Sequence, residues 1–410
     1  MKFLCFGESA YISTGTGLLS RNILPILMEM GHEIELVAIN HFEDDHAGKV
    51  YPFKIHPCPI SDAYNIQKMQ DMILQGNYDA LFLSADVGQL NGMAPMIRSM
   101  KHQKGMPVFM YTCSDCDLIN HQTLECLSIA DYPVVYSQHS KTIAQRYLPA
   151  LNIQVITPGC EPELFYPLDP EQRREARQKI FGLGDDAFLV LSVNRNQWRK
   201  DPGRTLMIFH KFRESHPEAV LYMHMKMHDI GGSIPDTAQI IGMRLVNPGA
   251  EIIFTGPQFN EQQGVPREAL NLVYNSADVM ISTSTGEGWG LTTTDCMSSG
   301  TPLVVPRNTS FTEIIGENEE RGYLADSGGD IDHLAIPYGI SDNPRALVHS
   351  SSMLEKLEQV YQHREEARKK AQAAREWTLE HTWEHVREEW KALFSRIEQP
   401  VEVTHGTAVL

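Results

Sequence analysis

Short apolar runs of strand length alternate along this chain with longer stretches in which hydrophobic residues recur at helical spacing. One helical pattern, Leu18–Met30, stops at Gly31, the residue type that most often follows a helix. Strands that alternate with helices are typical of parallel, doubly wound sheets. We therefore predict an α/β fold with a parallel sheet in each half of the chain. The expected strands are Lys2–Gly7, Glu33–Ile39, Ala80–Ser84, Val108–Tyr111, Val134–Ser137, Ile153–Thr157, Phe188–Val193, Val220–Met225, Ile252–Thr255, Val279–Ile281 and Leu303–Val304.

The alternation is interrupted around residues 151–167, where the chain reads LNIQVITPGCEPELFYP. An irregular, proline-rich stretch between a strand and a charged helical pattern is typical of a domain boundary. The length of 410 residues also exceeds the roughly 250–300 at which one hydrophobic core usually divides. We predict an N-terminal domain at 1–158 and a C-terminal domain at 159–378. A terminal helix at 379–399 should pack back on the N-terminal domain, and 400–410 should form a flexible tail.

Composition and charge narrow the class of protein. The hydrophobic fraction of 42% is ordinary for a globular protein, and the net charge of −17 argues against tight non-specific binding to nucleic acid or anionic membranes. We find no apolar run long enough for a transmembrane helix, and the apolar run in MKFLCFGES is too short for a signal peptide. Seven scattered cysteines without an export signal favour reduced thiols, so we expect a cytoplasmic protein.

The main candidate site is Ser282–Val304, which reads STSTGEGWGLTTTDCMSSGTPLV. Glu287 lies in a glycine-rich loop after an apolar strand, and Asp295 lies in the helix that follows. Such a loop stands at the carboxyl ends of parallel strands, where open α/β sheets bind ligands. Its glycines let the backbone approach a ligand, and the helix N-terminus attracts anions. The two acids suit two hydroxyls of one polar ligand, although a plain turn with a solvated helix residue is the alternative interpretation.

Two further loops carry phosphate-binding chemistry. The first expected strand leads to Ser13–Gly17, whose glycines Gly15 and Gly17 precede a helix. This loop lacks the third glycine of the dinucleotide fingerprint, so NAD binding is disfavoured and a simple turn remains an alternative. After strand Phe188–Val193, Arg195 and Lys200 stand in a loop that opens another helix. Two cations there suit a diphosphate, with surface salt bridges as the alternative.

A metal site is a weaker hypothesis. Cys113, Cys116, His121 and Cys126 have the C-x2-C-x4-H-x4-C spacing of a zinc knuckle. They follow an apolar strand inside a regular α/β pattern, however, and acidic residues flank them. We therefore favour a strand-end loop with incidental cysteines and expect no metal in the site. The histidines of MHMKMH suit a polar strand end better than metal ligands.

In order along nearly the whole chain, these segments resemble the retaining, nucleotide-sugar-dependent glycosyltransferases of family 4, the glycosyl transferases group 1. The glycine loop is followed by a helix and GHEIELV, and VITPGCEPELFYP stands where the family has IPNGVD…F.P. VNRNQWRKDP corresponds to the family's GR…KG segment, STSTGEGWGLTTTDCMSSGTPLV to its acidic motif, and HTWEHVREEW to its terminal FTW-like helix. The resemblance implies the GT-B fold, in which two Rossmann-like domains face each other across a cleft.

The resemblance also implies roles for individual residues. Arg195 and Lys200 would bind the donor diphosphate and stabilise the leaving nucleotide, and Glu287 would contact hydroxyls of the transferred sugar. Asp295 stands where the family usually has a glutamate that holds the ribose. Asp115 is the nearest polar residue where the family commonly has a histidine. The remaining donor-side positions are Gly15, Thr16, Gly17, Gly288, Trp289, Gly290 and Leu291, and the acceptor-side positions are Asp86, Asn91 and Asp115.

The implied reaction moves a sugar from a UDP- or GDP-linked donor to an acceptor hydroxyl, with retention of configuration and without a metal or another cofactor. The acceptor would be a small molecule, a glycan or a lipid-linked molecule. The resemblance further implies that a released phosphate oxygen acts as the base, which fits a sequence in which no carboxylate pair for a covalent intermediate stands out. Two alternatives remain open. One is a glycosyltransferase that acts on hydroxymethylated bases in DNA, which the acidic charge disfavours, and the other is a catalytically degenerate sugar-nucleotide-binding module.

Overall fold

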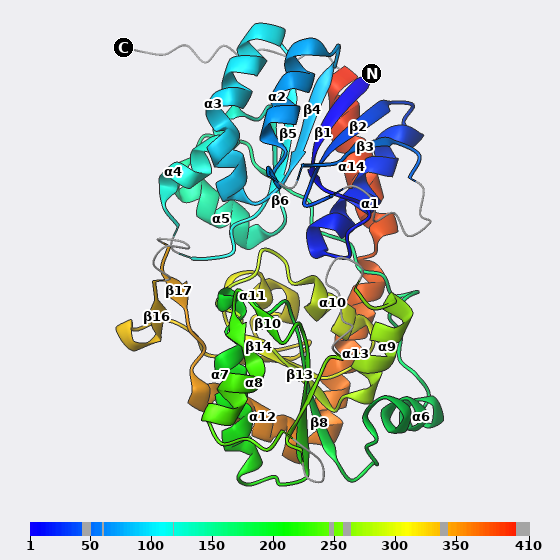
Figure 1. Cartoon of the computed structure of the whole chain (residues 1–410), viewed down its shortest axis with the longest axis vertical. Coiled ribbons are helices and arrows are strands. Elements are labelled where there is room, and N and C mark those ends of the chain that lie inside the picture. The colour runs from blue at the N-terminus through cyan, green and yellow to red at the C-terminus, as the bar shows by residue number, and fades with distance from the viewer. Residues whose placement is uncertain are drawn as a thin grey trace.

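The computed structural model describes residues 1–42, 51–59, 61–117, 119–245, 250–256, 264–336 and 343–398. The tail expected at 400–410 lies outside these residues. Figure 1 shows two α/β domains stacked along the long axis, the N-terminal one coloured blue to cyan and the C-terminal one mainly green to orange. None of the helices in the described ranges has both the length and the apolar character needed to cross a membrane.

The N-terminal domain is built on a parallel sheet with strand order β3-β2-β1-β4-β5-β6-β7. Helices cover both of its faces, so the central strands are buried on both sides, as parallel sheets require. The strands are β1 Lys2–Glu8, β2 Glu33–Ile39, β3 Lys54–His56, β4 Ala80–Ser84, β5 Val108–Thr112, β6 Tyr132–Val135 and β7 Gln154–Val155. The helices are α1 Gly15–Glu29, α2 Ile66–Gln75, α3 Val87–Lys104, α4 His121–Leu124 and α5 Gln138–Tyr147.

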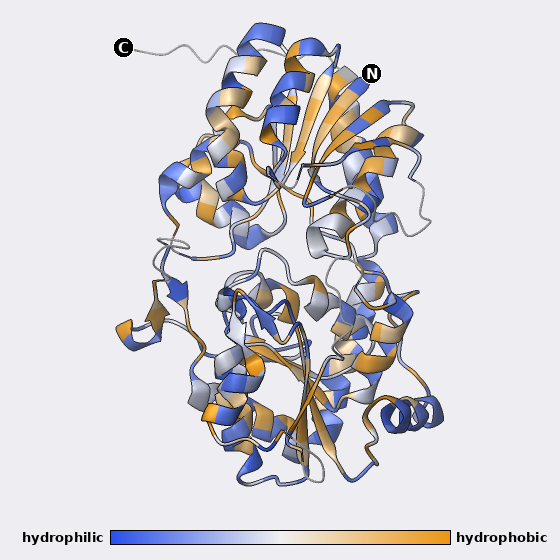
Figure 2. Cartoon of the chain, viewed as in Figure 1, coloured by the Kyte–Doolittle hydropathy of each residue, from blue (hydrophilic) through white to orange (hydrophobic). Residues whose placement is uncertain are grey.

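The C-terminal domain repeats this architecture with strand order β12-β9-β8-β13-β14-β15, again parallel. Figure 2 shows its apolar strands between helices with polar outer faces. The strands are β8 Phe188–Val193, β9 Ala219–His224, β12 Ile252–Phe254, β13 Val279–Ile281, β14 Leu303–Pro306 and β15 Tyr323–Ala325. The helices around them are α6 Pro170–Phe181, α7 Pro202–Arg213, α8 Ile234–Ile240, α9 Arg267–Ser276, α10 Leu291–Ser298, α11 Thr309–Ile315, α12 Ser350–Gln362 and α13 Arg364–Glu380.

The doubly wound fold expected in each half is confirmed, and the expected strands form with shifts of a few residues at their ends. In the two large sheets, the strands β3 and β15 had no counterpart among the expectations. Each has three residues and pairs with one neighbour at a sheet edge, so neither leaves a clear apolar run in the sequence.

The last helix, α14 (Trp383–Phe394), returns to the N-terminal domain, where its red ribbon lies among blue elements in Figure 1. Its Trp390 is fully buried, with its ring centroid 4.8 Å from that of Tyr111 and 5.7 Å from that of Phe82. Arg387 pairs with Glu29 of α1 on the surface. The helix therefore ties the C-terminal end of the chain to the first sheet.

Candidate functional site

Two strand-end loops of the C-terminal domain bring three charged residues together. Glu287 follows β13, and its carboxylate is 8% exposed. The ammonium of Lys200 donates to Oε1 of Glu287, and Nη1 of Arg199 donates to Oε2 at 3.2 Å. The same Nη1 donates to the carbonyl oxygen of Gly286 at 3.0 Å. A buried carboxylate between two cations is thus fixed in position by both of its oxygens.

Local backbone geometry explains why both cations face Glu287. The chain leaves β8 and forms a 3-10 turn, Trp198–Lys200, before Asp201 adopts the left-handed conformation with φ 48° and caps α7. Hydrogen bonds from the Glu287 loop to backbone carbonyls of this turn then join the two segments. The amide of Thr285 donates to the carbonyl of Arg199 at 2.8 Å, and Oγ1 of Thr283 donates to that of Lys200 at 3.0 Å. The two loops therefore form one unit at the strand ends.

The electrostatics of this cluster follow from burial and opposite charge. Burial alone would raise the pKa of Glu287, but Lys200 and Arg199 outweigh it and hold the pKa at about 2. Burial and the neighbouring Arg199 lower the pKa of Lys200 to about 8. Burial opposes the charge on Arg199, yet the carboxylates of Glu287 and Asp115 raise its pKa. Glu287 is therefore a permanent anion, whereas Lys200 is a cation that alkaline pH can discharge.

The N-terminal domain contacts this cluster at the ends of its own strands. A Cβ placed on Gly286 would lie 1.9 Å from the carbonyl oxygen of Asp115, and one on Gly288 would lie 2.2 Å from Sγ of Cys113. Gly286 also has φ 156°, which side chains rarely adopt. These two glycines permit a domain approach that any larger residue would prevent.

Two of the expected acceptor-side residues, Asp86 and Asp115, lie on the N-terminal side of this interface. Asp86 is the N-cap residue of α3, and Asn91 follows in the same helix. The Asp86 residue is exposed, yet the protein atoms packed around its carboxyl and the nearby charge of Asp115 raise its pKa. The side chain of Asp115 is 30% exposed and pairs with Arg345 at 2.9 Å.

The glycine loop after β1 is held by its own side chains. Thr14 caps α1 through the amide of Gly17, and the hydroxyl of Thr16 donates to the Glu8 carboxylate. A Cβ on Gly17 would lie 2.4 Å from the carbonyl oxygen of Ile12, so only glycine fits there. Gly15 lies close to the C-terminal domain, because a Cβ placed on it would be 3.1 Å from Cδ1 of Leu291. The loop thus stands opposite the N-terminus of α10.

Asp295 occupies a different environment from Glu287. It lies in α10 with a side chain that is 12% exposed, and its nearest cation, Nη2 of Arg267, is 3.8 Å from Oδ1. Arg267 pairs more closely with Glu161. Burial raises the pKa of Asp295 to about 8, because Arg267 compensates only part of the desolvation.

Two expected donor-side residues point elsewhere. Arg195 is 49% exposed and donates to the carboxylate of Asp229 at 3.0 Å, so it is not part of the Glu287 cluster. The side chain of Trp289 packs in the core beside Trp377, with ring centroids 6.4 Å apart. Sequence reasoning did not single out Arg199 and Arg345. The sequence signal for Arg199 was its place beside Lys200, but no signal linked the distant Arg345 to Asp115.

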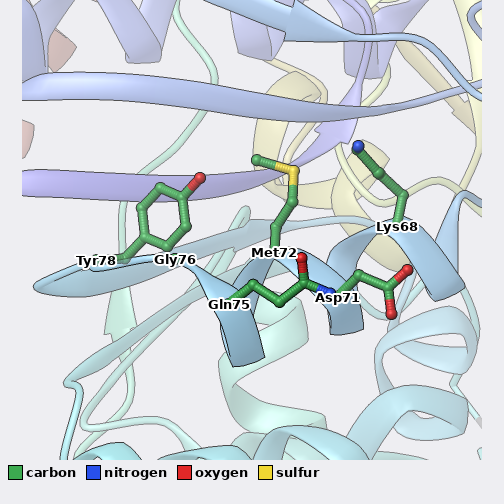
Figure 3. Close-up of a pocket in the computed structure, with 6 residues that line it drawn as sticks. All are labelled: Lys68, Asp71, Met72, Gln75, Gly76 and Tyr78. Atoms are coloured by element: carbon green, nitrogen blue, oxygen red, sulfur yellow. The ribbon is translucent and has the colours of Figure 1, made fainter.

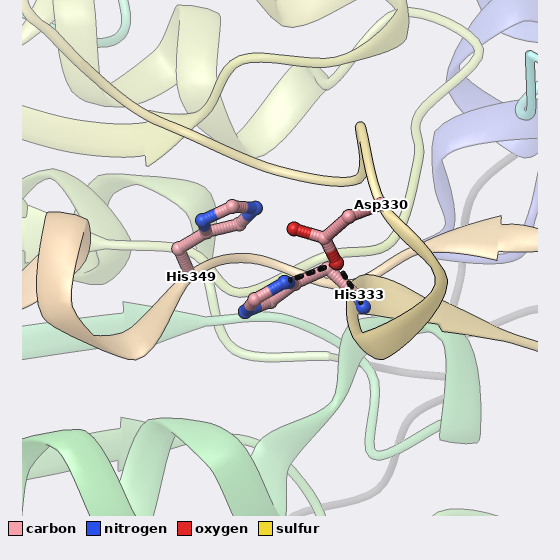
Figure 4. Close-up of side chains that lie close together, drawn as sticks. All are labelled: Asp330, His333 and His349. Atoms are coloured by element: carbon pink, nitrogen blue, oxygen red, sulfur yellow. Dashed lines mark hydrogen bonds and ion pairs between the residues drawn. The ribbon is translucent and has the colours of Figure 1, made fainter.

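The four residues with zinc-knuckle spacing do not bring their potential ligand atoms together. Cys116 and Cys126 are buried in the second hydrophobic core, and the ring of His121 stacks on Tyr147. Among the described residues, the only group of three potential ligands with adjacent donor atoms is Asp330, His333 and His349 (Figure 4). His224 is buried beside Tyr222, and burial lowers its pKa to about 4.

A shallow pocket of about 230 Å³ lies away from these loops, on the outer side of the N-terminal domain. Figure 3 shows that side chains of α2 and Tyr78 line it. Lys68 and Asp71 are its charged members. It has no residue in common with the loops around Glu287.

Comparison with known proteins finds a family match for the segment that contains the Lys200 and Glu287 loops. Residues 173–336 match the family model "Glycosyl transferases group 1". The matched residues include both the Lys200 loop and the Glu287 loop. A D-inositol 3-phosphate glycosyltransferase of Thermomonospora curvata is 28% identical over 201 residues, which cover 47% of this chain and 44% of that protein. A mannosylfructose-phosphate synthase of Agrobacterium fabrum is 28% identical, over 38% of this chain and 32% of that protein. The chain thus spans less than half the length of these curated relatives.

Solved structures match over nearly the whole chain. A sucrose-phosphate synthase from Thermosynechococcus elongatus aligns with a TM-score of 0.70 and 16% identity, over 97% of this chain and 99% of that one. HepE from Anabaena, in complex with UDP-glucose, aligns with a TM-score of 0.66 and 13% identity, over 96% and 99%. At these identities the likeness shows the fold, and the GT-B architecture expected from the sequence is confirmed.

Proposed function

We propose that this chain, whose residues 173–336 match group 1 glycosyl transferases within a GT-B fold, transfers a sugar from a nucleotide diphosphate to an acceptor hydroxyl. The observation that carries the proposal is the buried Lys200–Glu287–Arg199 cluster at the C-terminal ends of β8 and β13. Carboxyl ends of parallel strands are where open α/β sheets bind ligands. A buried anion held by two cations is suited to grip sugar hydroxyls beside a diphosphate.

In the proposed reaction, the bond between the sugar and the diphosphate breaks through an oxocarbenium-like state. Lys200 neutralises the negative charge that develops on the leaving diphosphate, and the acceptor oxygen attacks from the same face. A phosphate oxygen takes the acceptor proton, so the product keeps the configuration of the donor. Glu287 accepts hydrogen bonds from sugar hydroxyls, because its low pKa keeps it ionised.

The remaining expected residues have supporting roles in this proposal. Arg195 exchanges its partner Asp229 for the diphosphate, since its side chain is half exposed on the same loop. The Gly15 loop and the N-terminus of α10 meet across the interface and close over the phosphates. Asp295 holds the nucleotide ribose. The reaction needs no metal and no cofactor besides the donor, for which UDP-linked and GDP-linked sugars are the candidates.

The proposal is tested with purified full-length protein and a panel of UDP- and GDP-linked sugars. A true donor raises the melting temperature, because it binds only the folded state. The same donor should then release its nucleoside diphosphate in the presence of an acceptor alcohol.

Lys200→Ala should lower that release by a factor on the order of 10³, as expected when one electrostatic stabiliser of a transition state is lost. Lys211→Ala is the matched control, since Lys211 is an exposed lysine of the next helix, α7. Unchanged turnover in Lys200→Ala, or binding of donors without turnover in the wild type, would contradict the proposal.

A further inference from the structure

Arg199 is the one cation of the Glu287 cluster that also contacts the other domain. Its Nη1 holds Gly286 and Glu287, while its Nε lies 3.8 Å from Oδ2 of Asp115 in the N-terminal domain. Its side chain is 26% exposed, so the pairing with Asp115 is shielded from solvent more than a surface ion pair is. The guanidinium therefore joins Asp115 directly to the loop that carries Glu287.

Asp115 is held in turn by a segment from far along the chain. Residues 326–349, here called the arm, connect β15 to α12, and 337–342 of it lie outside the described residues. From the arm, Nη1 of Arg345 forms an ion pair with Oδ1 of Asp115 at 2.9 Å and donates to the carbonyl oxygen of Asp115 at 2.6 Å. The guanidinium of Arg345 also lies 5.4 Å from the ring centroid of Trp198, the residue before Arg199. Asp115 is thus enclosed by two arginines of the C-terminal domain.

The arm is braced at its base. Its strands β16 (Leu334–Ala335) and β17 (Arg345–Ala346) pair antiparallel, and they stand at the left edge of Figure 1. Figure 4 shows a hydrogen bond between Asp330 and His333, in which Oδ1 of Asp330 lies 2.7 Å from Nδ1 of His333. The ring of His333 stacks on His349 with centroids 3.5 Å apart, and Nε2 of His349 lies 2.8 Å from the carbonyl oxygen of Gly328. These contacts fix the direction in which the arm presents Arg345.

We propose that Arg199 is a positioning residue that couples docking of Asp115 to the orientation of Glu287, and that Arg345 on the arm holds Asp115 for this contact. The proposal rests on the proposed function for its effect on turnover. When the domains dock, Asp115 draws the guanidinium of Arg199 into line with both Gly286 and Glu287. When they separate, Arg199 loses its fixed partner, and the loop that carries Glu287 loses a support. Glu287 is thereby placed for chemistry only in the docked state.

The structural half of the proposal is tested without any ligand, by hydrogen exchange. Asp115→Asn and Arg199→Gln should each speed deuterium uptake of the peptide Ser284–Leu291 by a factor on the order of 10, because local opening becomes easier. Glu313→Gln is the control, since Glu313 also joins the domains, accepting from the amide of Gln138 at 2.9 Å. Unchanged uptake in both variants, or equal acceleration in the control, would overturn the coupling.

The functional half uses UDP binding and UDP release from UDP-glucose. In Arg199→Gln and in Asp115→Asn, kcat should fall about 100-fold, the scale of a misplaced catalytic group, while the Kd of UDP changes less than about threefold. The double variant should be no slower than the slower single variant, because both changes break one link. Arg199→Lys should recover part of the loss, since it restores the charge but not the fork.

The outcomes separate this proposal from the proposed function. If UDP affinity falls in parallel with turnover in Arg199→Gln, Arg199 is a diphosphate ligand and the positioning role is wrong. If the two losses add in the double variant, Asp115 and Arg199 act independently, and the coupling is wrong. If the wild type neither binds UDP nor cleaves UDP-glucose, the proposed function fails for this donor, and the exchange comparison alone decides the coupling.

Discussion

Glu287 and Asp295 belong to one strand–loop–helix unit and are both buried, yet their surroundings give them opposite ionisation. Lys200 and Arg199 contact both oxygens of Glu287 and hold its pKa at about 2. Asp295 has a single cation at 3.8 Å, and burial raises its pKa to about 8. The loop therefore carries a fixed anion, and the helix carries an acid that is protonated at neutral pH. Spacing places both acids at the site, but residues from outside the segment decide their charge.

The largest expected effect separates the two acids directly. Glu287→Gln should lower turnover by a factor on the order of 10³, because it weakens the proposed sugar contact and removes the carboxylate that neutralises Lys200 and Arg199. Asp295→Asn should lower turnover by less than about tenfold, since it keeps a neutral group that can hydrogen bond. Rates of nucleotide release measure both, with melting temperatures to confirm folding. Equal losses of turnover in Glu287→Gln and Asp295→Asn would show that the two acids do not differ in this way.

The second prediction concerns the glycine that lets the domains meet beside Glu287. Gly286→Ala should lower turnover about 100-fold, because its Cβ would lie 1.9 Å from the Asp115 carbonyl and its φ of 156° disfavours a side chain. Gly203→Ala in α7 is the control, since the nearest atom to its Cβ position is 4.0 Å away. Full activity in Gly286→Ala would show that catalysis does not need the docked geometry.

The third prediction is a pH dependence that originates in Lys200. Its pKa is lowered to about 8, so the cation is present below that pH and is lost as pH rises through it. We therefore expect kcat/KM, which reports groups of the free enzyme, to fall above pH about 8. Lys200→Arg should remove this alkaline limb, because arginine stays charged. Asp295 also ionises near pH 8, so persistence of the limb in Asp295→Asn is needed to assign it to Lys200.

Local patterns were sufficient to predict most strands of the two large sheets and to place Glu287 in a loop and Asp295 in the helix that follows. The alternation of apolar runs and helices is a local property, and Gly286, Gly288 and Gly290 mark the loop without any knowledge of the fold. Local patterns did not show which arginine of this loop contacts Glu287. The 3-10 turn directs the guanidinium of Arg199 inward and leaves that of Arg195 beside Asp229. Trp289 shows the same limit, since its position in the motif did not reveal that its ring packs in the core.

Most side-chain contacts between distant segments could not be predicted from the sequence. Arg345 lies 230 residues away from Asp115 in the sequence and donates to its carbonyl oxygen from the arm. The packing of the terminal helix was easier to predict, because its tryptophans require burial. Trp390 is buried against the first sheet. Sequence thus identifies which groups carry chemistry, and tertiary packing decides which of them meet.

The smallest expected effect is on stability, and it tests the environment of Asp295 alone. Its folded pKa of about 8 lies above the usual 3.8, so the folded state keeps a proton that the unfolded chain releases between these values. The protonated carboxyl therefore stabilises the fold fully below pH about 4, and this contribution is lost as pH rises toward 8. Asp295→Asn removes that loss. Its melting temperature relative to the wild type should accordingly rise by about 2 °C between pH 5 and pH 8.

The same carboxyl-to-amide change at exposed Asp185 serves as the control for this measurement. A pH-independent difference between Asp295→Asn and the wild type would mean that Asp295 is ionised in the folded protein. In that case Arg267 would neutralise Asp295 as completely as Lys200 and Arg199 neutralise Glu287. The two acids would then differ only in position, and the helix, like the loop, would present a fixed anion to the ligand.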